Sequence, residues 1–195
     1  MFQTINLHRH LNEVVCQGWS LIPIQMDCAY ELANQALHRF NLNFFKEASL
    51  SQSATPHRQI RNDQILWLDA KQLDLAPIEL ETLNGLEDLK SSLSQYFRIH
   101  LSEIECHYAI YEPGHFYHRH QDITQINNKR IFSFVIYLNE NWADDDAGEL
   151  IGYKNNTVLF KIKPQFSMIL FKSDVEHEVK VTNRQRLSLT GWFRK

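Results

Sequence analysis

The sequence predicts an α+β fold, in which helices from the first half of the chain pack outside one sheet of a β-sandwich or barrel formed by the second half. Apolar residues recur at helical spacing in two segments before residue 100, whereas short strand-like segments separated by turns follow from Glu103 onward. No internal repeat or low-complexity linker separates the halves. We therefore expect one domain over residues 1–195, with helical support mainly in 1–100 and the β core mainly in 103–195.

Each of the two expected helices has an apolar face that a core can cover. The first runs from Cys28 to Phe40, and Asp27 can cap it. The second begins near Pro77, a residue that suits a first helical turn, although Gly85 weakens the helix locally. The apolar positions are Ala29, Leu32, Ala33, Ala36 and Leu37 in the first helix, and Leu80, Leu83, Leu86, Leu89, Leu93 and Phe97 in the second.

A polar segment separates the two helices. It runs from Asn43 to Asp69, and its centre, Ser49 to His57, is rich in turn-forming residues. The stretch Ile60 to Leu68 then predicts a strand after a short turn. A loop of this length inside a compact domain is either functional or disordered, which makes it a candidate functional segment.

The second half predicts a series of antiparallel strands. Asn155 and Asn156 can take the positive-φ positions of a tight hairpin turn, so that the segment around them should fold back on itself. The segments expected to be extended are Glu105 to Tyr111, Arg130 to Leu138, Leu150 to Lys163, Ser167 to Lys172, Glu178 to Val181 and Arg186 to Phe193.

Composition limits the classes of function. The net charge of -3 and the pI near 6.4 give no reason to expect a nucleic-acid partner, because such proteins usually carry a clustered basic face. No segment has the pattern of a signal peptide or a membrane span, so we expect a soluble cytoplasmic protein with no membrane partner. Cys16, Cys28 and Cys106 are widely spaced and odd in number, which suggests neither a disulfide framework nor a thiolate metal site. The sequence does not define an oligomeric state.

Two histidines and one carboxylate are candidates for a metal site. Residues i and i+2 of an extended segment project to the same side, so His120 and Asp122 can chelate one ion, and His177 on a later strand can supply a third ligand. Such a set holds Fe(II) on one face and leaves positions open for a bidentate oxo acid and O2. His115 and His118 are competing candidates, for which partly exposed loop positions are the alternative interpretation.

The last strand carries an arginine that an anion should accompany. An arginine that faces a barrel interior is costly unless an anion pairs with it, and the distal carboxylate of 2-oxoglutarate would be that anion. The alternative is that this arginine lies at a solvent-exposed edge of the sheet. The alternation of the strand puts Arg186, Ser188, Thr190 and Trp192 on one face and Leu187, Leu189 and Phe193 on the other.

Six segments are characteristic of a known family when they occur together in this order, although none is specific alone. They are Ile60 to Trp67, Tyr111 to Asp122, Ile136 to Trp142, Ala147 to Leu150, His177 to Val179 and Arg186 to Trp192. With these segments the chain resembles, over residues 19 to 193, the prolyl-hydroxylase branch of the Fe(II)/2-oxoglutarate-dependent oxygenases, which contains the oxygen-sensing animal enzymes and their bacterial relatives.

The resemblance implies a double-stranded β-helix, or jelly-roll, with flanking helices. It implies Fe(II) at His120, Asp122 and His177, and 2-oxoglutarate paired with Arg186. O2 is then the second co-substrate, and ascorbate is a candidate reductant.

The resemblance also assigns residues around the metal. Tyr111 and Tyr117 would line the pocket near the co-substrate, while Trp192 and Arg130 would lie toward a peptide. The loop from Asn43 to Arg61 resembles the lid segment that closes over a bound substrate in these enzymes.

The chain departs from the family pattern in two places. The animal enzymes have a tyrosine hydroxyl against the distal carboxylate, where this chain has Ile136, and Ser188 or Thr190 is the candidate replacement. Ala147 replaces the first glycine of a Gly-Gly pair, which we expect to be a modest backbone change.

The function implied by the resemblance is hydroxylation of a prolyl residue in a protein substrate, with release of succinate and CO2. A translation component is one candidate substrate. The alternatives are the same chemistry on a free amino acid or other small molecule, and a non-catalytic metal-binding module. Nucleic-acid demethylation is disfavoured by the lack of a basic face.

Overall fold

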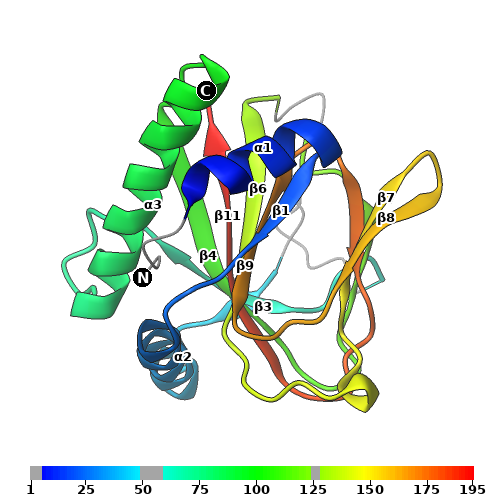
Figure 1. The fold of residues 1–195 in the computed structure, drawn as a ribbon. Coiled ribbons are helices and arrows are strands. Elements are labelled where there is room, and N and C mark those ends of the chain that lie inside the picture. Colours follow the sequence, from blue (N-terminus) through cyan, green and yellow to red (C-terminus); the bar gives the residue numbers. More distant parts are fainter. Residues whose placement is uncertain (1–5, 49–58, 124–127) are drawn as a thin grey trace.

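The computed structural model of the chain describes residues 6–48, 59–123 and 128–195 and contains two antiparallel sheets (Figure 1). The larger sheet has the strand order β1 (Trp19–Ile22), β9 (Ser167–Lys172), β6 (Arg130–Tyr137), β11 (Arg186–Arg194), β4 (Glu103–Tyr111), β3 (Gln64–Leu68) and β2 (Lys46–Glu47). The smaller sheet has the order β5 (Tyr117–His120), β10 (Glu176–Val179), β7 (Leu150–Lys154) and β8 (Thr157–Ile162).

Three helices, α1 (Leu7–Gln17), α2 (Met26–Asn41) and α3 (Pro77–Phe97), lie on the outer side of the larger sheet (Figure 1). A 3-10 turn, η1 (Asp144–Asp146), precedes β7. The apolar core therefore has two parts. One lies beneath the helices and includes Leu32, Leu86 and Phe134, and the other lies between the sheets and includes Tyr137 and Phe160. The expectation of an α+β jelly-roll with helices outside one sheet is confirmed.

The helix predictions are largely confirmed. Helix α3 begins at Pro77, as expected, and α2 covers the predicted stretch with one or two further residues at each end. The predicted cap is wrong, because Asp27 lies in the first turn of α2 and Gln25 precedes the helix without a side-chain cap. Helix α1 was not expected; it ends at Gly18, whose φ of 88° is accessible to glycine without steric cost.

The strand predictions miss β1 and β2, which were not expected, and differ from the structure at the ends of several other strands. The hairpin at Asn155 and Asn156 is confirmed, with φ values of 51° and 64° between β7 and β8. The strand expected from Ile60 begins only at Gln64, because Arg61 forms an isolated bridge with Tyr117 of the other sheet. The predicted lid loop contains the short strand β2, and its central residues, 49–58, lie outside the described residues.

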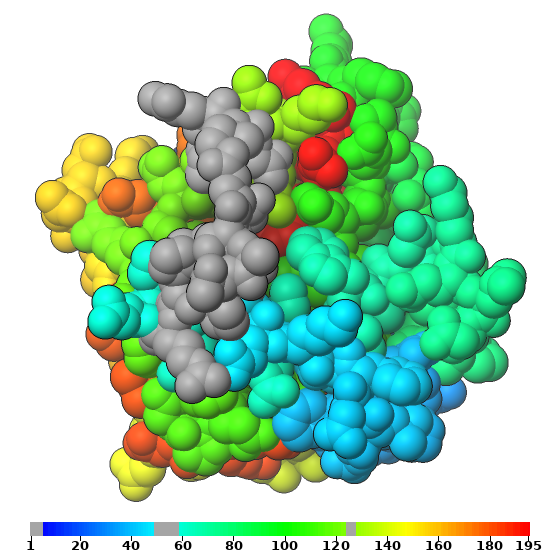
Figure 2. Space-filling view, turned by 180° about the vertical axis from the view of Figure 1, so that it is seen from behind, coloured from blue at the N-terminus to red at the C-terminus, as the bar shows by residue number. Residues whose placement is uncertain are grey.

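Seen from behind, both halves of the chain contribute to one face, on which atoms near the C-terminus (red) lie close to green and teal segments from the middle of the chain (Figure 2). None of the helices in the described ranges is long and apolar enough to cross a membrane.

Candidate active site

The smaller sheet brings His120, Asp122 and His177 together. Strands β5 and β10 pair so that His120 lies directly opposite His177, and Asp122 follows β5. The nearest ligand atoms of the three residues all lie within 4.8 Å of one another. His120 Nε2 is 3.8 Å from Asp122 Oδ1, and His177 Nε2 is 3.6 Å from Asp122 Oδ2. Among the described residues this is the only such cluster of histidine, cysteine and carboxylate side chains.

Hydrogen bonds orient each member of the cluster. His120 Nδ1 lies 2.8 Å from the His118 carbonyl and His177 Nδ1 lies 2.9 Å from the Val175 carbonyl, so each ring carries its proton on Nδ1. The Nε2 lone pairs are then free on the side of Asp122, which is the arrangement that metal-binding histidines need. The donor set of two imidazoles and one carboxylate fits a ferrous ion with open coordination positions.

Two serines hold the carboxylate in place. Ser133 Oγ donates a hydrogen bond of 2.6 Å to Asp122 Oδ2, and Ser173 Oγ lies 2.9 Å from Ser133 Oγ. Since Ser133 has one proton and gives it to Asp122, Ser173 is the donor in the second bond. Ser133 and Ser173 are both buried, and sequence reasoning did not identify either.

The protonation states also suit a cation. Burial lowers the pKa of His120 to about 3, and the nearby His177 adds to this effect. Burial raises the pKa of Asp122, but His177, His120 and the Ser133 hydrogen bond outweigh it, so the pKa lies below its usual value. At neutral pH the site therefore offers a neutral imidazole at His120 and an ionised carboxylate, which are the metal-binding forms.

A cavity of about 400 Å³ opens onto this cluster from between the sheets. Strands β4 and β11 run along this cavity, and their pairing gives the order of the residues on its wall. Arg186 lies opposite Tyr111, Thr190 opposite His107, and Trp192 opposite Glu105. Arg186 therefore lies at one end of the row and Trp192 at the other, roughly 20 Å apart at about 3.3 Å per residue.

Arg186 is 1% exposed, and the described residues supply no counter-ion to it. Its Nε donates to the Gly148 carbonyl at 3.0 Å, and its guanidinium carbon lies 4.9 Å from the ring centre of Tyr111 and 5.3 Å from that of Tyr137. Within the described part of the chain no carboxylate pairs with it. A buried cation without an anion is costly, so this end of the cavity is suited to the carboxylate of a ligand.

The backbone beside Arg186 depends on Ala147 and Gly148. A Cβ at Gly148 would lie 2.8 Å from Thr182 Oγ1, so this position requires glycine. Ala147 has φ 52° and ψ -140°, a conformation that is sparsely populated for residues with a Cβ and costs about 1–3 kcal/mol. The substitution of alanine for glycine is therefore more than the modest change that we expected.

The structure corrects the expectation at Ile136. This side chain packs in the core beneath the helices, whereas the next residue, Tyr137, points between the sheets toward Arg186. The Tyr137 hydroxyl is buried beside the Arg186 guanidinium, which can only donate to it, and its own proton has no acceptor in the described ranges. The tyrosine that we took to be missing is thus present one position later, and the alternation of β6 was the signal that could have revealed it.

The other predicted residues lie around the same cavity or next to it. Tyr117 stacks on His120 with ring centres 3.6 Å apart, and Arg130 lies over the Trp192 ring at 3.4 Å. Of the remaining predicted residues, Tyr111 and Thr190 line the cavity, whereas Ser188 is fully buried with its hydroxyl 3.5 Å from Arg186 Nη1.

The competing histidines do not join the cluster. His118 contributes its backbone carbonyl to His120, and His115 lines a separate depression with Arg61 and Asp63. Arg61, the last residue of the predicted lid loop, lines the cavity and pairs with the buried Asp63 at 2.6 Å.

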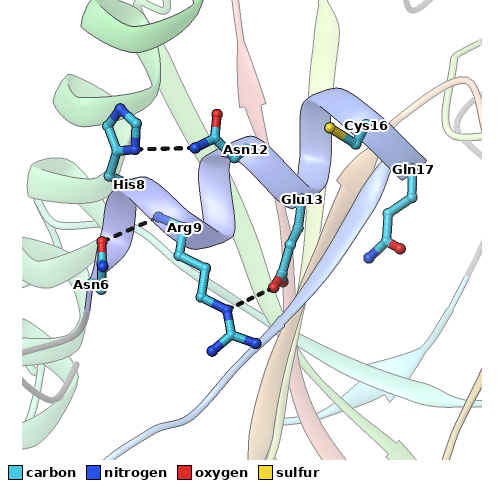
Figure 3. Close-up of a pocket in the computed structure, with 7 residues that line it drawn as sticks. All are labelled: Asn6, His8, Arg9, Asn12, Glu13, Cys16 and Gln17. Atoms are coloured by element: carbon cyan, nitrogen blue, oxygen red, sulfur yellow. Dashed lines mark hydrogen bonds and ion pairs between the residues drawn. The ribbon is translucent and has the colours of Figure 1, made fainter.

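A shallow depression also lies along the outer face of α1, and its side chains pair with one another (Figure 3). His8 bonds Asn12 at 3.1 Å, and Arg9 bonds Glu13 at 3.1 Å. These exposed pairs leave no buried charge to be neutralised, so we assign no chemistry to this depression.

The comparisons with known proteins agree with this geometry. Residues 106–194 match the model of the 2OG-Fe(II) oxygenase superfamily. A prolyl-4-hydroxylase from Pseudomonas putida is 32% identical, with a TM-score of 0.88 over 97% of this chain and 99% of that chain. A prolyl hydroxylase from Trichoplax adhaerens, in complex with a peptide fragment of the hypoxia inducible factor oxygen degradation domain, is 26% identical, with a TM-score of 0.81 over 98% and 93%. No curated protein gives a significant sequence match.

The chain belongs to the 2OG-Fe(II) oxygenase superfamily. It is a 2-oxoglutarate-dependent dioxygenase, an enzyme that uses Fe(II) with 2-oxoglutarate and O2 as co-substrates.

Proposed function

We propose that this dioxygenase hydroxylates a prolyl residue of a protein or peptide, with Fe(II) held by His120, Asp122 and His177 and 2-oxoglutarate held by Arg186. The observation that carries the co-substrate assignment is the unpaired, fully buried Arg186 at the end of a cavity that also contains the three candidate ligands. When bound, the metal supplies the oxidising chemistry, in which 2-oxoglutarate becomes succinate and CO2 and one oxygen atom enters the substrate.

The protein's own residues bind and orient in this proposal. Arg186 forms a two-point pair with the distal carboxylate, and the Tyr137 hydroxyl donates a further hydrogen bond to it. Burial raises the pKa of both Tyr137 and Tyr111, so both hydroxyls remain protonated donors at neutral pH. The apolar walls, which include Val135 and Phe171, exclude water and so strengthen these polar contacts.

The substrate class is supported by the relatives and by the mouth of the cavity. The Pseudomonas putida relative is a prolyl-4-hydroxylase, and the Trichoplax adhaerens relative was solved with a peptide. Trp67 lines the cavity yet is 44% exposed, so the cavity opens onto the surface at this point. An open aromatic mouth suits an extended peptide better than a free amino acid enclosed on all sides. A translation component as substrate, a cytoplasmic location and a single domain over residues 1–195 stay predictions.

The test of the substrate is direct. Protein reconstituted anaerobically with Fe(II) is added, with O2 and with or without 2-oxoglutarate, to an extract of cells that lack the gene. Mass spectrometry of the digested proteins should find one added oxygen atom on a prolyl residue only when 2-oxoglutarate is present. Oxygen added reproducibly to another residue type, or to small molecules alone, would sink the prolyl proposal and leave the enzyme class untouched.

The metal assignment has its own test. We expect His177→Ala to abolish both Fe(II) binding and turnover of 2-oxoglutarate, because one of three ligands is lost. His115→Ala is the matched control, since His115 lies outside the cluster. Anaerobic titration with Fe(II) measures binding, and full turnover by the His177 variant would refute the assignment.

A further inference from the structure

His107, a residue that the proposed reaction does not yet use, lines the cavity with an unsatisfied polar atom. It is 3% exposed, and its Nδ1 is buried without a hydrogen-bond partner among the described residues. Buried polar side-chain atoms nearly always have a partner, so each exception needs a reason.

The position of His107 is fixed on both sides by register. On β4 it lies between Trp67 of β3 and Thr190 of β11, and it shares the inward face of β4 with Ala109 and Tyr111. Thr190 is four positions beyond Arg186, which is about 13 Å along the strand. That span accommodates a five-carbon dicarboxylate extending from Arg186, so His107 lies toward the mouth.

The surroundings of His107 form an aromatic surface at this mouth. Its ring centre is 4.7 Å from Trp67 and 5.5 Å from Trp192, and Arg130 covers the other part of Trp192 while pairing with Glu105 at 3.0 Å. The two tryptophans offer apolar area and Arg130 already has its carboxylate, whereas the ring nitrogens His107 Nδ1 and Trp192 Nε1 are buried without a hydrogen-bond partner among the described residues. Of these two rings only that of His107 can also accept a hydrogen bond, because an indole N–H is a donor only.

We propose that His107 is a specificity-determining residue that hydrogen-bonds a peptide group of the substrate, next to the residue held against Trp67 and Trp192. The proposal rests on the proposed function, since it assumes a peptide at the mouth of the cavity. A neutral imidazole carries one N–H and one lone pair, so it satisfies either a carbonyl or an amide of the peptide backbone. A free amino acid that reaches only the metal lacks the flanking peptide group that His107 would read.

The test measures peptide binding without turnover. The full-length protein is loaded with Mn(II) and an unreactive analogue of 2-oxoglutarate, and is applied to an immobilised library of short peptides in which every position, including the centre, is randomised. His107→Leu removes both ring nitrogens, whereas His107→Asn retains a polar group near the place of Nδ1. His115→Leu is the matched control, because His115 also has a buried Nδ1 without a described partner but does not line this cavity.

The expected result is that His107→Leu weakens binding of the retained peptides about tenfold, while His107→Asn stays within about threefold of the natural protein. Affinity for the 2-oxoglutarate analogue and the melting temperature of the metal-free protein should not fall in His107→Leu, and His115→Leu should bind peptides normally. The proposal is overturned by equal peptide binding in His107→Leu, by no peptide retained on the natural protein, or by a large fall in melting temperature in both His107 variants. Retained peptides without proline at their centre would instead refute the prolyl assignment while leaving the His107 comparison intact.

Discussion

Among the described residues two arginines are almost completely buried, and their partners differ. Arg39 on α2 is 5% exposed and binds both carboxylate oxygens of Glu79 on α3 at 2.8 Å, with Asp74 at 2.9 Å. Arg186, between the sheets, is 1% exposed and meets a carbonyl, a distant serine hydroxyl and two tyrosine rings, with no carboxylate from the described residues.

The difference separates a charge that the fold uses from a charge that a ligand uses. Beneath the helices, Tyr108 also donates to Glu79 at 3.3 Å, so each member of that network has its partner inside the chain. Between the sheets, Arg186, Tyr137 and His107 each have hydrogen-bonding atoms that no described residue satisfies. Substitutions on the helix side should therefore affect stability, and those on the cavity side should affect ligand binding.

The largest expected effect is on the helix side. Arg39→Met leaves the carboxyl group of Glu79, 0% exposed, without its cation, and we expect a loss of about 3–5 kcal/mol in the free energy of unfolding. Chemical denaturation measures this loss, and the remaining folded protein should keep its KM for 2-oxoglutarate. Adding Glu79→Leu to this variant should recover part of the stability, and a double variant as unstable as the single one would contradict the pairing argument.

The corresponding change on the cavity side should have the opposite pattern. Arg186→Met should raise the KM for 2-oxoglutarate about 100-fold, because a charge-assisted pair is lost, while the free energy of unfolding of the metal-free protein changes by no more than about 1 kcal/mol. Steady-state kinetics and denaturation are both needed. If Arg186→Met were as destabilising as Arg39→Met, the two arginines would have the same structural role and the comparison would fail.

The pH dependence of stability sharpens the comparison further. Burial, aided by Arg61, lowers the pKa of His107 to about 3 in the folded protein, against an ordinary value of 6.5. Between these values the unfolded chain binds a proton that the native protein lacks. The free energy of unfolding should therefore fall as the pH falls below 6.5, with His107 contributing at most about 1.4 kcal/mol per pH unit.

Replacing His107 tests this contribution. His107→Leu should flatten the curve of unfolding free energy against pH between about pH 4 and about pH 6, and should leave it unchanged above the ordinary pKa, where neither state is protonated. Denaturation of the metal-free proteins at a series of pH values measures the slope. Parallel curves would show that His107 is not a neutral buried group.

The sequence predicted the parts of the fold that have a one-sided apolar pattern. Helices α2 and α3 have continuous apolar stripes, and both were found. Helix α1 was missed although it is amphipathic, because it is short and polar overall and only His10, Leu11 and Val14 are buried. The strand at residue 60 was placed too early because Arg61 and Asp63 pair with each other instead of extending the ladder to β4.

The candidate site divides in the same way. His120, Asp122, His177 and Arg186 are polar residues in recognisable local patterns, and the structure brings the first three together and leaves Arg186 unpaired nearby. The role of Tyr137 was not predicted because β6 is apolar on both faces. Phe132 and Phe134 face the helices and Val135 faces the other sheet, so the alternation of residue types does not show which side chains point into the cavity. His107 was not identified as a cavity residue for the same reason, since β4 is buried on both faces from Cys106 onward.

The smallest expected effect is at Tyr137, and it compares the two sides with the same chemical change. Tyr137 and Tyr108 are both 0% exposed, but the Tyr108 hydroxyl donates to Glu79, whereas the proton of the Tyr137 hydroxyl has no acceptor among the described residues. Tyr108→Phe should lower the free energy of unfolding by about 1 kcal/mol and leave the KM for 2-oxoglutarate unchanged. Tyr137→Phe should raise that KM about fivefold without lowering stability, because the lost hydrogen bond exists only with the co-substrate bound. Since both variants remove one oxygen atom from a buried ring, identical results for the two would show that the unsatisfied hydroxyl is no mark of a ligand site.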